Sequence, residues 1–239
     1  MKTSTANQLL DINRRFYDKF GSSFSATRRR IQPGVRRIIE TLKGDEKILD
    51  LGCGNGELAR QLALQDHSGL YLGLDFSLPL LQDAEYQTGS FPVSFQQFDL
   101  ADPNWNVIFP GSPFDVVFAF AVLHHIPGWE LRRNLLQMVN DLLGSSGYFV
   151  HSEWQFLNSE KLRRRIQPWQ VVNLTTDDVD EGDFLLDWRQ GGQGLRYVHH
   201  FTETELAELA NESGFRILES FFSDGSGGRL GLYQVWKKN

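Results

Sequence analysis

A short stretch between residues 47 and 57 constrains the fold of this chain more than any other feature. The strand-like run KILDL at 47–51 is followed by the glycine-rich turn GCGNG at 52–56, and a helix-forming sequence begins at Glu57. Glycines are needed where the backbone turns tightly or where a ligand approaches the main chain, because a Cβ would block either one. The stretch predicts an α/β sheet that binds a nucleotide-like ligand where its first strand ends.

Strand-like and helix-like segments alternate from residue 47 onward, which is typical of a largely parallel sheet. Strands are predicted at 47–51, 69–74, 93–98, 114–120 and 148–151, with helices at 56–65, 77–87 and 129–143. A capping box at 202–205 predicts the last helix, and strands at 215–222 and 230–237 predict a hairpin. We expect a Rossmann-like α/β fold with a seven-stranded, mostly parallel sheet, helices on both faces and a final antiparallel hairpin.

Two segments stand outside this alternation. Residues 6–20 carry apolar residues at helical spacing, and Pro33 opens a second helix at its favoured position, so residues 1–44 are predicted to form a helical cover. Residues 156–201 are long and show little apolar periodicity, which is typical of a functional excursion. We expect them to form a substrate-binding insert within the main domain at 45–239.

Composition narrows the function classes. A net charge of −6 argues against a uniformly basic nucleic-acid surface. Arginines nevertheless cluster at 28–30, 36–37, 132–133 and 163–165, so local phosphate-binding patches and plain solvated helix faces both stay open. No run of about 18 apolar residues predicts a membrane span. With a single cysteine and no signal-like segment, we expect a cytoplasmic protein without a membrane partner.

The residues around the turn indicate which nucleotide-like ligand fits. A dinucleotide fingerprint would place its third glycine where Glu57 stands, and no lysine follows the turn as a P-loop requires. The turn also lacks a basic residue to meet a pyrophosphate. Asp75 ends the second strand, where a ribose diol needs a two-oxygen acceptor. A nucleoside without phosphate fits best.

The segment from Asp50 to Gly56 resembles the first motif of class I S-adenosylmethionine-dependent methyltransferases. The resemblance implies S-adenosylmethionine as cofactor, with Asp75 at its ribose and Asp99 at its adenine amino group. The segment from Ala121 to His124 resembles the one after strand four, which lines the methionine part and admits the substrate. The cofactor-binding residues that the resemblance implies are Asp50, Gly52, Cys53, Gly54, Gly56, Asp75, Phe76, Asp99, Leu100 and Ala121.

Residues 182–188 and 194–201 resemble one subgroup, which methylates carboxymethyl-modified wobble uridines of tRNA and includes versions fused to an AlkB-like dioxygenase. The chain departs from that pattern at Asp187 and Val198, which stand where the subgroup has proline and a second tyrosine. The resemblance implies tRNA as substrate, and the need for a partner subunit stays open. The predicted catalytic residues are His125, Arg196, Tyr197 and His199, and the predicted substrate-binding residues are Arg28, His124, Trp154, Trp188 and Arg189.

The chemical nature of the methyl acceptor decides which catalytic groups the site must supply. A carboxylate with a pKa of about 4 is ionised at neutral pH and needs oriented donors such as Arg196, not a base. A hydroxyl or amine acceptor would need a base, for which His124 or His125 is placed. The alternatives to these site roles are structural: packed histidines, a structural ion pair at Arg196 and core tryptophans. A small-molecule methyltransferase and a non-catalytic cofactor-binding partner protein stay open as functions, and no metal site is predicted.

Overall fold

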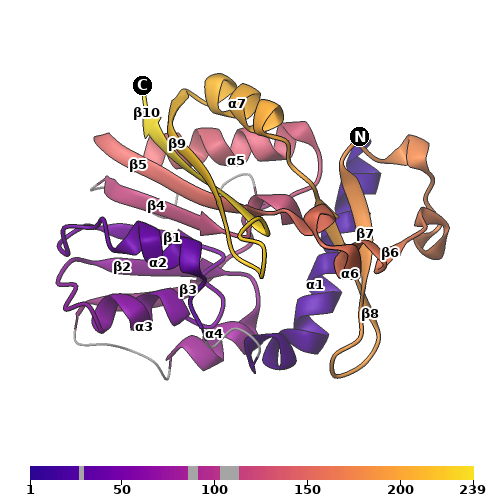
Figure 1. Ribbon diagram of the computed structural model, residues 1–239, viewed down its shortest axis with the longest axis horizontal. Helices are drawn as coiled ribbons and strands as arrows, with labels where there is room; N and C mark the ends of the chain where they lie inside the picture. The colour runs from indigo at the N-terminus through magenta and orange to yellow at the C-terminus, as the bar shows by residue number, and fades with distance from the viewer. Residues whose placement is uncertain (27–29, 86–90, 103–112) are drawn as a thin grey trace.

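A seven-stranded sheet forms the centre of the computed structural model, which describes residues 1–26, 30–85, 91–102 and 113–239 (Figure 1). The strand order is β3-β2-β1-β4-β5-β10-β9, in which β10 runs antiparallel to the other six strands. The strands are β1 (Ile48–Leu51), β2 (Tyr71–Asp75), β3 (Val93–Gln97), β4 (Phe114–Phe120), β5 (Leu143–Trp154), β9 (Phe215–Ser223) and β10 (Gly231–Lys238). The predicted sheet and final hairpin are confirmed.

Helices cover both faces of the sheet, as the sequence predicts. Successive strand residues point to opposite faces, so Leu49 and Leu51 pack with α5 (Trp129–Leu142) and α7 (Glu203–Glu212). Ile48 points the other way and packs with α2 (Pro33–Ile39) and α3 (Glu57–Ala63). The central strands β1, β2 and β4 are buried on both sides, which explains their nearly continuous apolar sequences.

The first helix, α1 (Thr3–Ala26), is longer than the segment 6–20 predicted from sequence. The prediction ended the helix at Gly21, but this glycine packs against α4 (Leu78–Glu85). Its Cβ position lies 3.4 Å from Ser77 Oγ and 3.5 Å from Pro79 Cβ, so a small residue lets the two segments approach closely. Tertiary packing therefore extends the helix through a weak helix former. None of the helices in the described ranges is long and apolar enough to span a membrane.

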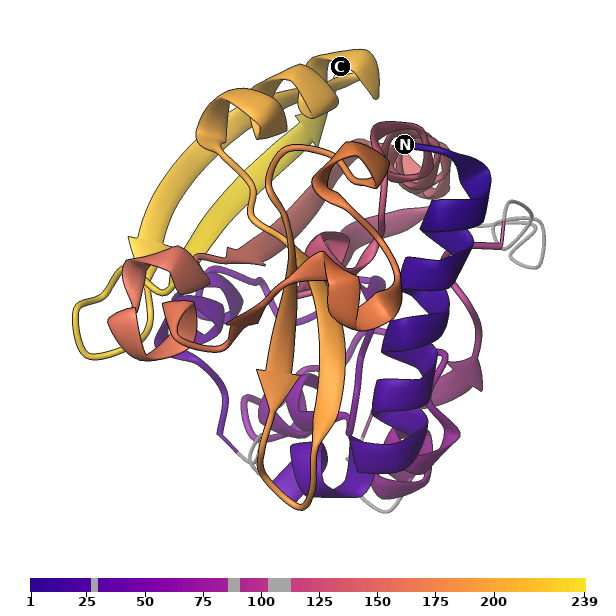
Figure 2. The ribbon, with the colours of Figure 1, turned by 90° about the vertical axis from the view of Figure 1, so that its right-hand side faces the viewer.

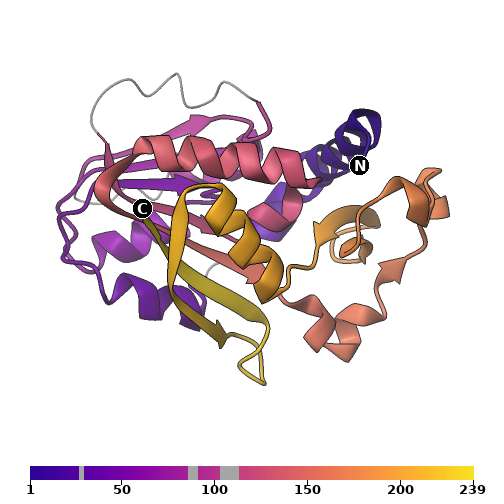
Figure 3. The ribbon, with the colours of Figure 1, turned by 90° about the horizontal axis from the view of Figure 1, so that it is seen from above.

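The segment 156–201 holds a second, small sheet that the sequence did not predict. Its strands are β6 (Ile166–Gln167), β7 (Asp183–Trp188) and β8 (Gly194–His199), paired antiparallel in the order β6-β7-β8. β7 is largely buried on both of its sides, so it lacks the apolar-polar alternation that marks a half-exposed strand. Seen from above, this segment stands beside the end of the large sheet (Figure 3). It also contains the short helix α6 (Glu160–Arg163).

The insert, defined here as residues 156–201, packs along α1 (Figure 2). One apolar cluster joins Leu9 of α1 to Trp169 and Leu185, and a second joins Phe16 to Trp188 and Leu80. The helix is therefore held between the insert and α4. This arrangement brings the amino-terminal segment to the carboxyl ends of the parallel strands, where ligands bind in α/β folds.

Candidate active site

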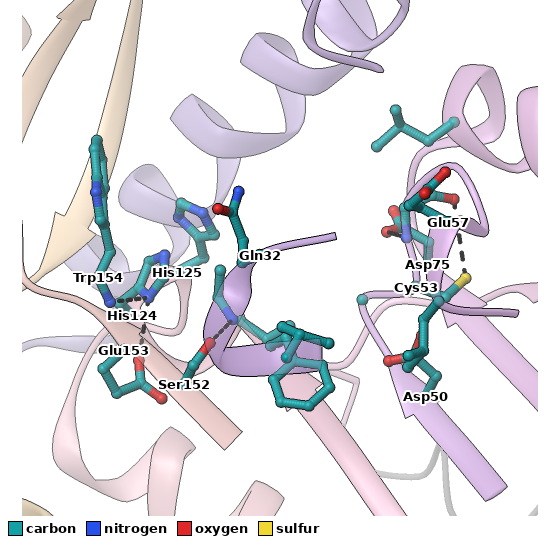
Figure 4. Close-up of a pocket in the computed structure, with 18 of the residues that line it drawn as sticks. Gln32, Asp50, Cys53, Glu57, Asp75, His124, His125, Ser152, Glu153 and Trp154 are labelled. Atoms are coloured by element: carbon teal, nitrogen blue, oxygen red, sulfur yellow. Dashed lines mark hydrogen bonds and ion pairs between the residues drawn. The ribbon is translucent and has the colours of Figure 1, made fainter. Parts of the chain in front are cut away.

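A cavity lies where β1, β2, β4 and β5 end. Its volume is about 480 Å³, within the range of roughly 300–1,000 Å³ that is usual for small-molecule sites. In Figure 4 the labelled side chains form two groups that face each other across this space. One group is acidic and includes Asp50 and Asp75, and the other holds two histidines with Glu153 and Trp154. The cavity therefore has two chemically different sides.

The glycine turn forms the wall of the acidic side. Gly52 and Gly54 have φ of +67° and +56°, a conformation that favours glycine. A Cβ on Gly52 would come within 2.6 Å of Val122 Cγ2, whereas a Cβ on Gly54 would meet no described atom within 4 Å. Gly54 therefore leaves the main chain open to a ligand. Cys53 also lines the cavity, and burial raises the pKa of its thiol well above its usual range.

Asp75 closes β2 and holds both of its oxygens in fixed positions. Oδ2 accepts the backbone N–H of Gly54 at 2.9 Å, and Oδ1 accepts that of Ser77 at 2.8 Å. Burial raises the pKa of Asp75 to about 6, although these hydrogen bonds oppose the shift. A carboxylate has about four acceptor positions, so these bonds leave acceptor capacity for a ribose diol.

Asp50 lies at the end of β1 beneath the same turn. Its Oδ2 accepts the hydroxyl of Tyr71 at 2.5 Å. Burial raises the pKa of Asp50 to about 7, the charge of Asp75 adds to this, and the Tyr71 hydrogen bond opposes it. A positively charged ligand group near these two carboxyls would favour their ionised forms.

Asp99 follows β3 and is held by the amino-terminal helix. Its Oδ2 accepts hydrogen bonds from Nε and Nη2 of Arg14 at 3.0 and 2.7 Å. Its Oδ1 accepts a hydrogen bond from the backbone N–H of Ala101 at 2.9 Å. Phe76 and Leu100 line the same part of the cavity. This part combines flat apolar surface with a carboxylate acceptor, the pair that a planar ring with an exocyclic amine requires.

Ala121 marks the border between the two sides of the cavity. It has φ of +60°, a left-handed conformation that costs a non-glycine residue about 1–2 kcal/mol. Its N–H is shared between the backbone oxygen of Ser152 at 2.9 Å and the Ser152 hydroxyl at 3.1 Å. These bonds hold the strained turn that leads from β4 to the short 3₁₀ helix η2 (Leu123–His125).

His124 and His125 lie on the second side of the cavity and have different hydrogen-bond partners. Nδ1 of His125 lies 3.1 Å from the backbone oxygen of Tyr197, and its Nε2 lies 3.0 Å from the Tyr17 hydroxyl. His125 is therefore hydrogen-bonded to protein at both ring nitrogens. Nδ1 of His124 lies 3.1 Å from Oε2 of Glu153, which is buried at the end of β5.

Arg196 is the cation of the second side. Its side chain projects from β8 and lines the cavity. The residue is 93 % buried, since its exposed fraction is 7 %. Its guanidinium carbon lies 4.9 Å from the ring centre of Trp154, 5.3 Å from that of Phe16 and 5.9 Å from that of Trp188. Aromatic faces attract a guanidinium by cation–π interaction. These contacts hold the side chain in place beside the cavity.

Tyr197 and His199 lie outside the cavity lining, in a buried polar cluster with Arg132, Asp183 and Glu205. The Tyr197 hydroxyl donates to Asp183 at 2.7 Å, and His199 bridges Asp183 at 2.7 Å and Glu205 at 2.9 Å. Arg132 joins the cluster through Glu205 at 3.2 Å. This cluster connects the insert to α5 and α7.

Three other predicted site residues also lie elsewhere. A Cβ on Gly56 would approach Ala84 Cβ and Phe95 Cζ at 3.0 Å, so this glycine serves the packing of the turn. Trp188 packs edge-on against Phe16, with ring centres 5.5 Å apart, and Arg189 pairs with Asp187 at the surface. Arg28 lies outside the described residues. The other predicted site residues all line the cavity: Asp50, Gly52, Cys53, Gly54, Asp75, Phe76, Asp99, Leu100, Ala121, His124, His125, Trp154 and Arg196.

The cavity residues that the sequence missed include several on α1, among them Asn13, Arg14 and Tyr17. Asn13 carried a signal, since it lies on the apolar stripe of the helix, where a polar side chain needs a partner. Its Oδ1 accepts the buried N–H of Tyr197 at 2.9 Å. Ser152 and Glu153 were missed because the predicted strand ended at residue 151, whereas β5 continues to Trp154.

The acidic side fits S-adenosylmethionine. Asp75 offers acceptor positions for the ribose diol, Asp99 an acceptor for the adenine amine, and Gly54 an open main chain. When bound, this cofactor supplies a methyl group on a positively charged sulfur. Within the described ranges, no group of three or more His, Cys, Asp or Glu side chains is arranged to hold a metal ion.

Comparison with known proteins gives the same assignment. The model of a methyltransferase-domain family matches residues 24–220. A methyltransferase of Encephalitozoon cuniculi is 30% identical over 206 residues, which covers 86% of this chain and 87% of that protein. The tRNA (carboxymethyluridine(34)-5-O)-methyltransferase of Schizosaccharomyces pombe is 26% identical over 85% of this chain and 88% of its own length.

Solved structures share the fold at lower identity. A methyltransferase from Methanosarcina mazei superposes with a TM-score of 0.66 at 23% identity, covering 87% of this chain and 98% of that one. Magnesium protoporphyrin IX methyltransferase from Synechocystis superposes with a TM-score of 0.61 at 16% identity, covering 95% and 97%. With the family match, the cavity and the sheet order in agreement, this chain belongs to the class I S-adenosylmethionine-dependent methyltransferases.

Proposed function

We propose that this methyltransferase esterifies the carboxylate of a carboxymethyl group on a wobble uridine of tRNA. The observation that carries the proposal is Arg196, a buried guanidinium on the side of the cavity that faces the acidic cofactor side. Such a cation complements an anionic acceptor, and Arg binds carboxylates through charge-assisted hydrogen bonds. The Schizosaccharomyces pombe relative, a tRNA (carboxymethyluridine(34)-5-O)-methyltransferase that aligns with 85% of this chain, supports the same substrate class.

The chemistry of this reaction suits the second side of the cavity. A carboxylate oxygen attacks the methyl carbon, an O–C bond forms, the S–C bond breaks, and the products are a methyl ester and S-adenosylhomocysteine. No proton moves, so the step requires no general base. What it requires is an oxygen held in line with the methyl group, since positioning supplies most of the rate in such a displacement.

The remaining residues of the second side have roles in this proposal that follow from their chemistry. Trp154 offers a ring face on which a nucleobase can stack, an interaction of about 1–3 kcal/mol per base. Arg163 and Arg164 are exposed at the carboxyl end of α6 in the insert, where they would meet tRNA phosphates. Phosphate contacts of this kind make binding salt-dependent. Arg28, Trp188 and Arg189 stay predicted substrate-binding residues, and Tyr197 and His199 stay predicted catalytic residues.

A methyl-transfer assay tests the proposal. Purified protein and S-adenosylmethionine are incubated with tRNA that carries a carboxymethylated wobble uridine, with the same tRNA lacking that group, and with small carboxylic acids. Mass spectrometry of the digested nucleosides should show one added methyl group on the modified uridine only. Methylation of another nucleoside, or of none, would contradict the proposal.

Arg196→Ala tests the acceptor side separately. Loss of a charge-assisted hydrogen bond costs roughly 1.5–3 kcal/mol, so kcat/KM should fall about 10- to 100-fold. Binding of S-adenosylhomocysteine, measured by calorimetry, should stay unchanged. Arg216→Ala is the matched control, because this exposed arginine lies at the opposite end of the sheet. Full turnover in Arg196→Ala would remove Arg196 from the site.

A small-molecule acceptor is the second candidate. It is favoured by the net charge of −6, which disfavours broad contact with a polyanion. The 27-O-demethylrifamycin SV methyltransferase of Amycolatopsis mediterranei is 30% identical over 41% of this chain. Methylation of the small acids in the assay above, without methylation of tRNA, would establish this candidate.

A further inference from the structure

Gln32 is a polar residue of the cavity wall whose side chain does not take part in holding the fold. It lines the cavity and is half-buried. Within the described part of the chain, its amide has no hydrogen-bond partner. In Figure 4 the side chain projects from the segment before α2 into the space between the two labelled groups. A ligand that displaces water from this amide has to replace the lost hydrogen bonds.

The position of Gln32 at the start of α2 explains why its amide is not used by the helix. It is the N-cap residue, where a short side chain usually accepts a hydrogen bond from the helix itself, but its side chain forms no such bond. Pro33 follows and has no N–H. The N–H of Gly34 donates instead to Oδ1 of Asp224 at 3.0 Å. A distant residue therefore caps α2, and the Gln32 amide stays available to the cavity.

Asp224 also attaches the start of α2 to the second side of the cavity. Its Oδ2 accepts the hydroxyl of Tyr233 at 2.6 Å. On the neighbouring strand, Tyr233 is paired with Ser152, which directly precedes Glu153. Asp224 and Ser152 both line the cavity. These contacts place Gln32 where the methyl acceptor is expected.

We propose that Gln32 is a specificity-determining residue that recognises the acceptor nucleobase by two hydrogen bonds, and that Asp224 is the residue that positions it. The inference rests on the proposed function and specifies how the uracil ring is bound. Nε2–H would donate to the uracil O4, and Oε1 would accept from N3–H, since an amide offers a donor and an acceptor side by side. Unstacked bases in RNA are commonly recognised along this edge.

The geometry of the nucleobase gives this contact a role in the reaction. O4 lies next to C5, the ring atom that carries the carboxymethyl group. Contacts to the ring edge by Gln32 and to the carboxylate by Arg196 would fix both ends of the acceptor, which favours one orientation of the attacking oxygen. A neutral amide suits this position, because an acidic side chain would repel O4 and a second cation would compete for the carboxylate.

Gln32→Ala and a substrate methylated on N3 test the contact together. With the carboxymethylated tRNA, Gln32→Ala should lower kcat/KM about tenfold. A methyl group on N3 of that uridine removes the donor, so it should lower kcat/KM at least tenfold in the parent but less than about threefold in Gln32→Ala. Equal losses in both proteins would overturn the proposal.

Two controls accompany these measurements. S-adenosylhomocysteine binding should be the same in Gln32→Ala as in the parent, which shows that the cofactor side is intact. Gln65→Ala should leave turnover unchanged, because this exposed glutamine follows the carboxyl end of α3, away from the cavity.

Two variants of Asp224 test its positioning role. Asp224 has φ of +69°, which glycine adopts without strain, so Asp224→Gly removes both hydrogen bonds without adding backbone strain. It should lower kcat/KM roughly tenfold and make the enzyme less sensitive to the N3 methyl group. Asp224→Asn keeps an oxygen for the Gly34 N–H and should stay within about threefold of the parent. Full turnover in Asp224→Gly would remove Asp224 from the proposal.

Nuclear magnetic resonance detects the Gln32 contact without methyl transfer. The ¹⁵N-labelled protein with S-adenosylhomocysteine is titrated with 5-carboxymethyluridine nucleoside, and the Gln32 amide signal is assigned by its absence in Gln32→Ala. The nucleoside should shift this signal, and its N3-methyl derivative should not. A signal that the nucleoside leaves in place would overturn the proposal.

The outcomes separate this inference from the proposed function. If the parent methylates the tRNA and Gln32→Ala does so equally well, the proposed function stands and the role of Gln32 is wrong. If the parent leaves the tRNA unmethylated but the nucleoside shifts the Gln32 signal, the proposed function fails while recognition of the base by Gln32 stands.

Discussion

At the scale of single residues, Gly54 and Gly56 have nearly the same backbone but different surroundings. Their φ angles are +56° and +72°, so alanine is strained at both, by about 1–2 kcal/mol. The Cβ would enter open cavity at Gly54, but would press on Ala84 and Phe95 at Gly56. One glycine therefore serves the ligand and the other serves the fold.

Substitution of each glycine by alanine should separate these roles. Gly56→Ala should lower the free energy of unfolding by about 2–4 kcal/mol, from backbone strain plus overpacking, and change the affinity of the remaining folded protein little. Gly54→Ala should cost only the strain of about 1–2 kcal/mol, yet weaken S-adenosylhomocysteine binding at least tenfold. Urea denaturation and calorimetry measure the two quantities. Equal loss of affinity in both variants would contradict the assignment of Gly54 to the ligand.

Asp75 makes cofactor binding depend on pH. Its pKa is raised to about 6 by burial, so the carboxylate that accepts the ribose hydroxyls predominates only above that pH. Affinity for S-adenosylhomocysteine should rise with pH by up to tenfold per unit below about 6 and level off above it. Calorimetric titration from pH 5 to 8 measures this.

The neighbouring carboxyl provides the control for that titration. The pKa of Asp50 is about 7, so its ionisation overlaps the upper part of the range. In Asp50→Asn, the affinity for S-adenosylhomocysteine should still rise with pH near pH 6. In Asp75→Asn, the affinity should be weak at every pH, and this rise should be absent. The stability effect has the opposite sign. Because Asp75 binds its proton more tightly when folded than when unfolded, its contribution to stability falls as pH rises from about 4 to 6. A rise near pH 6 that survives in Asp75→Asn would show that another group controls binding.

At the scale of secondary-structure elements, α1 connects the two sides of the cavity. Its Arg14 holds Asp99 on the cofactor side, and its Tyr17 holds His125 on the other. Asn13 fixes the helix to β8 through the N–H of Tyr197. The helix thus positions groups of both sides at once, although neither contact is visible from the periodicity of its sequence.

Asn13→Ala should loosen this connection. The variant leaves the buried N–H of Tyr197 without its acceptor, which costs about 1–3 kcal/mol of unfolding free energy. Arg15→Ala on the same helix removes only an exposed pair with Asp11 and should cost less than about 0.5 kcal/mol. Urea denaturation of the two variants gives the comparison. An Asn13→Ala protein as stable as Arg15→Ala would show that α1 is held by apolar packing alone.

At the scale of the whole molecule, the insert is joined to the sheet domain by a buried charged cluster. Arg132 of α5 is 1 % exposed and lies 3.5 Å from Asp183 of β7 and 3.2 Å from Glu205 of α7. His199 and Tyr197 complete the hydrogen bonds of Asp183. Such a cluster adds little net stability, but removing one partner leaves a buried charge uncompensated.

Neighbouring arginines on α5 provide a matched test of that cluster. Arg132→Leu should lower the free energy of unfolding by about 3–5 kcal/mol, because Asp183 then lacks its counter-charge. Arg133→Leu removes partly exposed pairs with Glu130 and Glu212 and should cost less than about 1 kcal/mol. Thermal or urea unfolding measures both. Similar losses in the two variants would mean that the cluster does not hold the insert.

The strand period explains why sequence grouped Arg196, Tyr197 and His199 although the structure separates them. All three stand within six residues and carry donor groups suited to one site. They lie on β8, where successive side chains point to opposite faces, so Arg196 faces the cavity while Tyr197 and His199 face the buried cluster. Had 194–199 been identified as a strand, this separation would have followed from the sequence.

The sequence by itself determined the sheet and the cofactor side of the cavity. The glycine turn, Asp75 and Asp99 all follow parallel strands, and the carboxyl ends of such strands meet at one edge, so local pattern is enough to bring them together. The acceptor side was decided only by tertiary structure. His124, Glu153, Arg196 and α1 meet through packing between distant segments, and burial within that packing raises the pKa of Glu153 well above its usual range, which its residue type alone does not show.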